Sequence, residues 1–271
     1  MDRFKGTMIL SDIDGTLIDQ DHIISRQNRE AIAYFQSRGG IFTLATGRTP
    51  YGLSLIDADL INAPIICYNG AVIHDIKTGR RLWHHPLPND CRRAVEFSDV
   101  HLPETGIQVY TMDAIWIYGD NEIVQRHLTA ENIIGVRYTT QLDEIPTPWL
   151  KVIFMQPADQ TDNVRDLILK QDFAPDYHFV KSYKEYYEML AKGVTKGSAM
   201  AQLAQMTGLD PQNIIAVGDN DNDIEMLQCA GCGVAVGNAT RPLKDVADKI
   251  TVSHNDSAIA HIIDHFDSYF S

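Results

Sequence analysis

The chain has 271 residues, of which 44% are hydrophobic, and its 23 basic and 36 acidic side chains leave a net charge of −13. This length is sufficient for one large domain or two smaller ones with a sizeable core. The acidic balance argues against a nucleic-acid-binding protein, which usually carries a basic face, and against docking on anionic lipid. A small anionic substrate stays compatible with it, provided that the site supplies its own positive groups.

The four cysteines are too sparse for a disulfide framework. Cys229 and Cys232 have C-x-x-C spacing, but there is no second pair to complete a metal site, so we interpret them as small residues at a helix end. The N-terminal segment does not resemble a signal peptide, and no apolar run approaches the ~20 residues that cross a bilayer. We therefore expect a cytoplasmic protein that has no membrane-spanning segment.

The first third of the chain alternates short apolar strands with helices. Strands are predicted at 8–10, 41–45 and 65–68, and helices at 25–38 and 50–60. Ser25 is expected to cap the first helix and Gly39-Gly40 to end it. This alternation predicts a parallel sheet with crossover helices.

The middle third has strands that are richer in Tyr, Trp and Thr. Strands are predicted at 108–111, 115–118, 136–139 and 150–154, and helices at 90–100, 121–129 and 162–170. Half-buried strands of this kind predict an antiparallel sheet with helices on one face. We expect residues 83–187 to form a domain inserted into a core made of residues 1–82 and 188–271, because insertion at an exposed loop is structurally inexpensive.

The last third of the chain again alternates short apolar strands with helices. A helix is predicted from Lys196 to Met206 with Gly208 at its end, followed by strands at 214–217, 233–236 and 250–252. Asp210-Pro211 predicts a cap and a first helical position. The fold class is therefore α/β, with a Rossmann-like parallel-sheet core and an inserted α+β domain.

Asp12 and Asp14 follow the first strand and precede Gly15 and Thr16. Two carboxylates about 4 Å apart repel by roughly 4 kcal/mol at an effective dielectric near 20. A cation is therefore implied, and Mg²⁺ held by carboxylates and a substrate phosphate is the usual solution. A calcium loop would need a glutamate at its twelfth position, where this chain has Ile23.

Three further signals stand at predicted element boundaries. Thr46-Gly47-Arg48 ends the second strand and offers a hydroxyl and backbone N–H groups to a phosphate. Lys196 begins a helix, and Asp219 to Asp223 follow the strand at 214–217. Each signal alone has a structural alternative, such as a helix cap, a solvated lysine or an acidic first turn. Their joint occurrence favours one site beyond the carboxyl ends of the strands.

These four motifs together resemble the haloacid dehalogenase-like hydrolase superfamily, and within it the Cof-type phosphatases that carry a large α/β cap inserted after the third core strand. The resemblance covers essentially the whole chain and includes Tyr68-Asn69-Gly70-Ala71 after the third strand. It implies a Rossmann-like core and a cap, formed by residues 83–187, that selects the substrate.

The resemblance implies a role for each acidic residue. Asp12 would be the nucleophile that forms an aspartyl-phosphate, and Asp14 the general acid and later the base. Magnesium would be bound by the Asp12 carboxylate, the backbone carbonyl of Asp14 and Asp219, with Asp223 orienting these ligands.

The resemblance also implies how the phosphate and the rest of the substrate are held. The phosphate oxygens would be held by Thr46, Gly47, Lys196 and Asn222. Asn69 and Gly70 would lie in a substrate loop, and residues 17–24 would form a small β-hairpin flap.

The function expected from these residues is a magnesium-dependent phosphatase acting on small phosphorylated metabolites, such as sugar phosphates or phosphorylated cofactors. A phosphomutase or phosphotransferase that uses the same intermediate, and a non-catalytic module that binds a phosphometabolite, remain open. We expect a monomer or weak homo-oligomer with no nucleic-acid or membrane partner.

Overall fold

The computed structural model describes residues 2–53 and 56–269, and its chain divides into two compact units. Unit 1 comprises Met1–Trp83 and Thr195–Ser271, and unit 2 comprises His84–Val194. Every predicted site residue lies in unit 1. In the described part of the chain, no helix combines the length and the apolar character that crossing a membrane requires.

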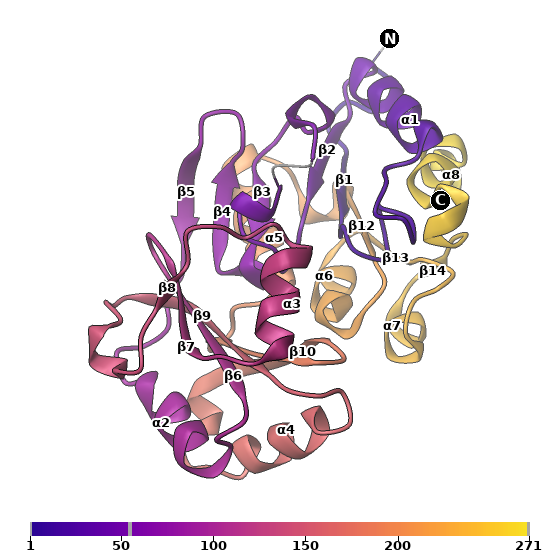
Figure 1. Cartoon of the computed structure of the whole chain (residues 1–271). Helices are drawn as coiled ribbons and strands as arrows, with labels where there is room; N and C mark the ends of the chain where they lie inside the picture. The colour runs from indigo at the N-terminus through magenta and orange to yellow at the C-terminus, as the bar shows by residue number, and fades with distance from the viewer. Residues whose placement is uncertain (1, 54–55, 270–271) are drawn as a thin grey trace. The chain divides into compact units, whose positions relative to one another are not determined.

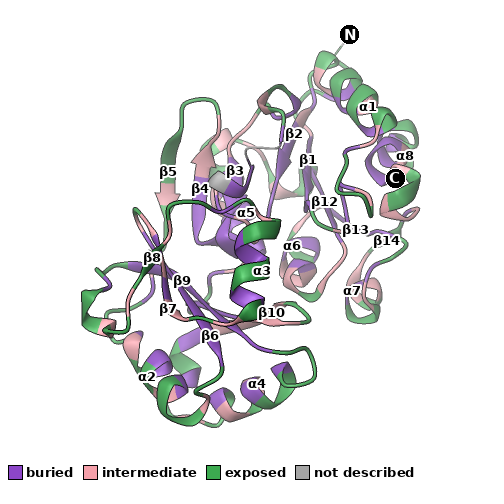
Figure 2. Cartoon of the chain, in the orientation of Figure 1, coloured by how far each residue is buried: buried purple, intermediate pink, exposed green. Residues whose placement is uncertain are grey.

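Unit 1 is built on a parallel sheet in which β1 lies between β12 and β2. The strand order is β14-β13-β12-β1-β2, with the bounds Lys249–Ile250, Cys232–Ala235, Ile214–Gly218, Met8–Ser11 and Ile41–Leu44. Strands β1 and β12 are buried along their whole length, as Figure 2 shows. Apolar strands buried on both faces are typical of parallel sheets, and the predicted α/β fold class is confirmed.

Helices of unit 1 pack in pairs around this sheet. Their bounds are Arg26–Ser37 (α1), Lys196–Thr207 (α5), Ile224–Cys229 (α6), Arg241–Val246 (α7) and Ala258–Asp264 (α8). Helix α1 packs on α8, and α5 packs on α6 (Figure 1). The Asn28 side chain of α1 is fully buried and accepts a hydrogen bond from the Ala260 backbone N–H, 2.9 Å away, which ties the first helix to the last.

The predicted cap of α1 and the predicted ends of α5 are confirmed. The Ser25 hydroxyl accepts a hydrogen bond from the Asn28 N–H and caps α1. Helix α5 begins after Thr195, whose side chain and that of Ser198 form a capping box. It ends at Gly208, which adopts a left-handed conformation. Lys196 is thereby fixed as the first residue of α5.

The third predicted strand differs from expectation. Strand β3 (Ile65–Cys67) approaches the parallel sheet through a bridge between Ala45 and Ile66, and pairs antiparallel with β4 (Val72–Asp75). With β5 (Arg80–His84) these strands form a separate three-stranded sheet. The reason is the tight turn at 68–70, which returns the chain beside β3. A crossover helix at this point would instead have continued the parallel sheet.

Two short predictions in unit 1 are wrong in the described residues. The helix expected at 50–60 is replaced by 3₁₀ turns at Tyr51–Leu53 and Ala58–Leu60, while residues 54–55 lie outside the described part. The flap expected at 17–24 contains no strand. The Asp19 carboxylate instead accepts hydrogen bonds from the N–H groups of Asp21 and Ile23, and local bonds of this kind compete with strand pairing.

Unit 2 contains a six-stranded sheet in the order β10-β11-β9-β6-β7-β8. The strand bounds are Tyr177–Tyr183, Tyr186–Ala191, Trp149–Met155, Gly106–Thr111, Ile115–Gly119 and Arg137–Tyr138. Neighbouring strands are antiparallel, as predicted, except that β8 runs parallel to β7. Strands β10 and β11 were not predicted, and they carry charged residues such as Lys181 and Glu188 that weaken the apolar alternation.

The helices of unit 2 lie on both faces of its sheet, which corrects the prediction of a single covered face. Helices α2 (Arg92–His101) and α4 (Thr161–Leu169) share an apolar cluster with Ile107 of β6. Adjacent strand residues point to opposite faces, and Gly106 approaches α3 (Glu122–Ala130), where a Cβ atom would lie 2.4 Å from Val124.

The division between the units falls after Val194, and not after Tyr187 as the sequence predicted. The cause is β11, which pairs with β9 and β10 and so belongs to the sheet of unit 2 up to Ala191. Cys229, at the end of α6, is an exposed free cysteine, whereas Cys232, at the start of β13, is buried.

Candidate active site

The parallel register places two aspartates side by side at the carboxyl edge of the core sheet. Ser11 pairs with Val217, and the Asp12 N–H continues the ladder by donating to the Val217 carbonyl, 2.9 Å away. Asp219 follows Gly218, the last residue of β12. The positions of both carboxylates are therefore set by backbone hydrogen bonds of buried strands.

Lys196 joins the first of these aspartates to the acidic turn that follows β12. Its ammonium lies 2.7 Å from Oδ1 of Asp12 and 2.6 Å from Oδ1 of Asp223, and its side chain is fully buried. Burial opposes the charged ammonium, but the two carboxylates outweigh it and raise the pKa of Lys196 above its usual value. The lysine is therefore a fixed positive charge against the side chain of Asp12.

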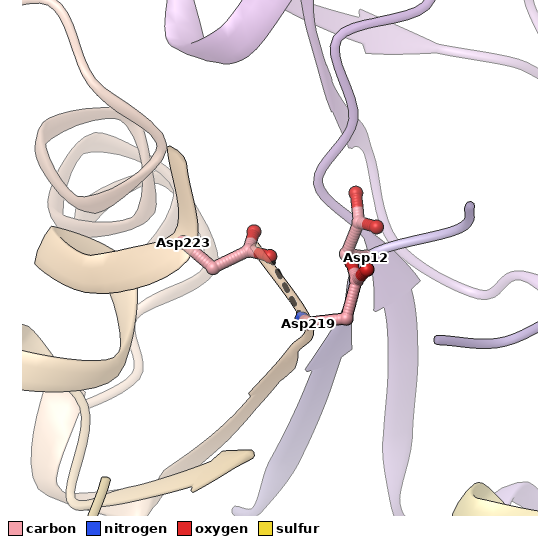
Figure 3. A group of neighbouring side chains, drawn as sticks. All are labelled: Asp12, Asp219 and Asp223. Atoms are coloured by element: carbon pink, nitrogen blue, oxygen red, sulfur yellow. Dashed lines mark hydrogen bonds between the residues drawn. The ribbon is translucent and has the colours of Figure 1, made fainter. Parts of the chain in front are cut away.

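Asp223 is held by protein donors on both of its oxygens. Oδ1 accepts from Lys196, and Oδ2 accepts from the backbone N–H groups of Asp219 and Asn220 at 3.0 and 3.2 Å. Figure 3 shows the Asp223 carboxylate directed at the Asp219 nitrogen. Asp223 thus fixes the acidic turn and Lys196, which fits an orienting role better than that of a direct metal ligand.

Asp12, Asp219 and Asp223 form a group that could hold a cation. One oxygen from each lies within 4.8 Å of the others. Burial raises the pKa of Asp12 to about 7 despite the opposing charge of Lys196, and burial together with the charges of Asp12 and Asp223 raises the pKa of Asp219 to about 8. A cation bound between carboxylates whose pKa values are raised in this way would favour their ionised forms.

A divalent cation fits this group by charge and by donor type. Three ionised aspartates and one ammonium sum to 1 − 3 = −2, which a divalent ion neutralises. Hard cations prefer carboxylate oxygens, and Asp12 and Asp219 retain oxygens beyond those that Lys196 and Thr16 contact. The structure therefore fits a divalent metal between these two side chains.

Three of the predicted phosphate-binding residues, Thr46, Gly47 and Asn222, are linked through Asn69 of the predicted substrate loop. The Thr46 carbonyl accepts from the Asn69 N–H at 3.0 Å, and Oδ1 of Asn69 accepts from the Asn222 side chain at 2.9 Å. Gly47 lies so close to Asn69 that a Cβ atom would approach its amide group to 3.2 Å. The structure thus brings Thr46, Gly47, Asn69 and Asn222 together.

Two glycines permit close approaches that other residues would prevent. Gly15 has φ +76°, and a Cβ atom there would lie 2.5 Å from Oδ2 of Asp219. Gly70 has φ +110°, and a Cβ atom there would lie 2.2 Å from the Thr195 carbonyl oxygen. Glycine adopts such conformations without steric cost, so these positions seat the Asp12 loop against Asp219 and the Asn69 loop against the start of α5.

Asp14 stands apart from the cation group. Its carboxylate is paired with Arg48 through two hydrogen bonds, from Nε at 2.8 Å and from Nη2 at 2.5 Å. The metal role expected for Asp14 concerned its backbone carbonyl, and its side chain is not among the clustered oxygens of the described residues. No role was predicted for Arg48, although it directly follows the predicted phosphate-binding turn.

Comparison with known proteins identifies the family of this chain. The model of the haloacid dehalogenase-like hydrolases matches residues 9–263. The chain belongs to this family. Putative phosphatase YxeH of Bacillus subtilis is 30% identical over 264 residues, covering 94% of this chain and 96% of that protein.

Two further relatives extend the comparison. The 5-amino-6-(5-phospho-D-ribitylamino)uracil phosphatase YwtE of B. subtilis is 30% identical over 284 residues, covering 94% of this chain and 96% of that protein. The solved structure of a haloacid dehalogenase-like hydrolase from Bacteroides thetaiotaomicron has a TM-score of 0.82 and 27% identity, covering 97% of this chain and all of that one. The predicted family and the enzyme class, a phosphatase, are confirmed.

Replacing Asp219 by asparagine should stabilise the metal-free protein, and more so at high pH. The folded pKa of Asp219, about 8, lies above its ordinary value of 3.8, so ionisation lowers the free energy of unfolding progressively between these values. The melting temperature of Asp219→Asn in EDTA should exceed that of the wild type by about 2 °C or more at about pH 8.5, with a smaller difference near pH 6. Asp221→Asn, which removes an exposed carboxylate from the same acidic turn, is the control. A difference in melting temperature between Asp219→Asn and the wild type that does not grow with pH would contradict the raised pKa of Asp219.

Replacing Gly70 by alanine should destabilise unit 1 by about 1–3 kcal/mol, because the new methyl group meets the Thr195 carbonyl. Urea unfolding measures this change. Gly79→Ala is the matched control, since Gly79 also has a positive φ, +68°, but a methyl group at that position would have no other atom within 4 Å. Equal losses in the two variants would show that backbone strain alone, and not the contact with Thr195, is responsible.

Proposed function

We propose that this chain is a magnesium-dependent phosphatase that hydrolyses small phosphorylated metabolites through an aspartyl-phosphate on Asp12. The observation that carries the proposal is the geometry of Asp12, which is fixed by the β1 ladder, contacted by the Lys196 ammonium and clustered with Asp219. A carboxylate held in this way beside a positive charge is suited to attack phosphorus.

In the first step the Asp12 carboxylate attacks phosphorus while the bond from phosphorus to the leaving oxygen breaks. Asp14 donates its proton to that oxygen, and the alcohol departs. Its side chain is 48% exposed, which leaves it accessible to a substrate and to water. Lys196 stabilises negative charge on the phosphoryl oxygens from a fixed position.

In the second step water attacks the phosphorus of the aspartyl-phosphate and gives a proton to Asp14. The bond between Asp12 and phosphorus breaks, and inorganic phosphate leaves. Thr46, Gly47 and Asn222 hold the phosphate oxygens in both steps through hydroxyl, backbone and amide donors. Magnesium, when bound by Asp12, the Asp14 carbonyl and Asp219, would supply charge neutralisation and orient a phosphate oxygen.

We further propose that unit 2 serves as the cap that selects the substrate, with Asn69 and Gly70 contributing from unit 1. The substrate class is a small phosphorylated metabolite, which is supported by the relative named as a 5-amino-6-(5-phospho-D-ribitylamino)uracil phosphatase. The same intermediate could also serve a phosphomutase, which would yield an isomerised sugar phosphate in place of free phosphate. Product analysis separates the two.

The purified protein should release phosphate from 4-nitrophenyl phosphate, and EDTA should abolish this release until excess Mg²⁺ restores it. The crowded carboxylates need a cation to accept an anionic substrate. Asp12→Asn should lose activity to the background level, because an amide cannot act as the nucleophile. Asp221→Asn should stay active as the control. Activity that is insensitive to EDTA, or retained by Asp12→Asn, would refute the proposal, and ligand-induced melting shifts without turnover would favour a binding module.

Lys196→Ala should lower kcat/KM by a factor of about 10² or more, by analogy with the loss of one preorganised electrostatic stabiliser. Because removing the lysine leaves buried carboxylates unpaired, its melting temperature should also fall. Steady-state assays well below that temperature separate the two effects, with Lys244→Ala, a half-buried lysine of the same unit outside the proposed site, as the control. A near-normal rate in the folded variant would remove Lys196 from the site.

A further inference from the structure

Arg48 donates hydrogen bonds to both oxygens of Asp14 and so forms a bidentate ion pair with it. Nε donates to Oδ2 at 2.8 Å and Nη2 donates to Oδ1 at 2.5 Å. A guanidinium bound in this way fixes the plane of the carboxylate as well as its position. The proposed phosphatase reaction requires orientation of this kind at Asp14, because a proton must pass to a particular oxygen of the substrate.

The arginine is anchored independently of Asp14. The backbone N–H of Arg48 donates to the Thr46 hydroxyl oxygen at 3.1 Å, and its backbone carbonyl accepts from the Tyr68 N–H at 3.1 Å. Its side-chain Nη1 donates to the Gly52 carbonyl at 3.3 Å. These contacts join Arg48 to the turn after β2 and to the end of β3. The first two contacts fix the backbone of Arg48, and the third holds its guanidinium through Nη1, a nitrogen that does not bond to Asp14.

The exposure of the two side chains shows which partner orients the other. The Arg48 side chain is 12% exposed, whereas that of Asp14 is 48% exposed. An exposed carboxylate would otherwise sample several rotamers, and ordering it costs side-chain entropy. The better-buried arginine therefore positions the more exposed aspartate.

We propose that Arg48 is a positioning residue that directs the Asp14 carboxyl toward the leaving oxygen of the substrate; this inference rests on the proposed function. A carboxylate offers about four lone-pair sites. Arg48 fills one on each oxygen, so each oxygen keeps a site for the proton that passes to the departing alcohol. The same geometry lets Asp14 receive the proton of the attacking water.

The leaving group of the substrate tests this role. 4-Nitrophenolate departs without a proton, whereas the alkoxide of propyl phosphate needs one. The value of kcat/KM reports the steps up to the departure of the alcohol, so water activation in the second step does not affect it. Losing the general acid should therefore slow the alkyl substrate by about 10²–10⁴-fold and the aryl substrate much less.

The experiment measures kcat/KM for both substrates, with Mg²⁺ present, in Asp14→Ala, Arg48→Ala, Arg48→Lys and the double variant Asp14→Ala with Arg48→Ala. We expect Arg48→Ala to lose more than tenfold more activity on propyl phosphate than on 4-nitrophenyl phosphate. Arg48→Lys should share this selectivity, since one ammonium cannot hold both oxygens. In the double variant, loss of Arg48 should add little to the selectivity already lost with Asp14. Arg26→Ala, an exposed arginine paired with Glu30, is the control.

Four outcomes would overturn the assignment of Arg48. Equal losses of kcat/KM on both substrates would mean that Arg48 binds the phosphate or stabilises the fold. Full activity of Arg48→Lys would mean that only the positive charge matters. Losses that multiply in the double variant would mean that Arg48 acts independently of Asp14. A faster Arg48→Ala enzyme would likewise contradict it. If Asp14→Ala itself shows no dependence on the leaving group, the proposed function fails at the general acid, which is a distinguishable result.

Discussion

The pairing of the buried Lys196 ammonium with Asp12 and Asp223 is the interaction on which the rest of the site depends. It joins the end of β1, the turn after β12 and the first residue of α5 through two contacts below 3 Å. A buried ion pair of this kind contributes little net stability, yet removing one partner leaves an uncompensated charge. The fold therefore retains a charged arrangement that an apolar core would not need, which is typical of a functional site.

The acidic residues of the site divide their tasks according to the donors around them. Asp223 is saturated by Lys196 and two backbone N–H groups, so it organises the turn. Asp12 and Asp219 each accept fewer hydrogen bonds than Asp223, and burial raises the pKa of each. Asp14 pairs with an arginine outside this group. Chemically identical side chains thus acquire different properties from their neighbours.

The sequence predicted the elements whose signals are local. Strands β1, β2 and β12 are short apolar runs, and the parallel arrangement that they imply places Asp12, Thr46 and Asp219 at one edge of the sheet. The sequence did not predict that β3 would join a second sheet. The turn at 68–70 depends on backbone conformation and on the close approach of Gly70 to Thr195, which no local pattern shows. Strand β11 was missed because its buried Glu188 pairs with Lys151 of β9, a contact that no local pattern shows.

The pair of Arg48 and Asp14 shows the same limit inside the site. The two residues are 34 positions apart and lie on different loops, so only the register of β1 against β2 brings them together. Once they are together, the pair leaves one uncompensated carboxylate fewer in the proposed phosphate site of a chain whose net charge is −13. Lys196 and Arg48 each offset a carboxylate, and a bound divalent cation would offset the remaining charge. The few groups within a Debye length of a bound phosphate would therefore decide its attraction, because charges farther away are largely screened.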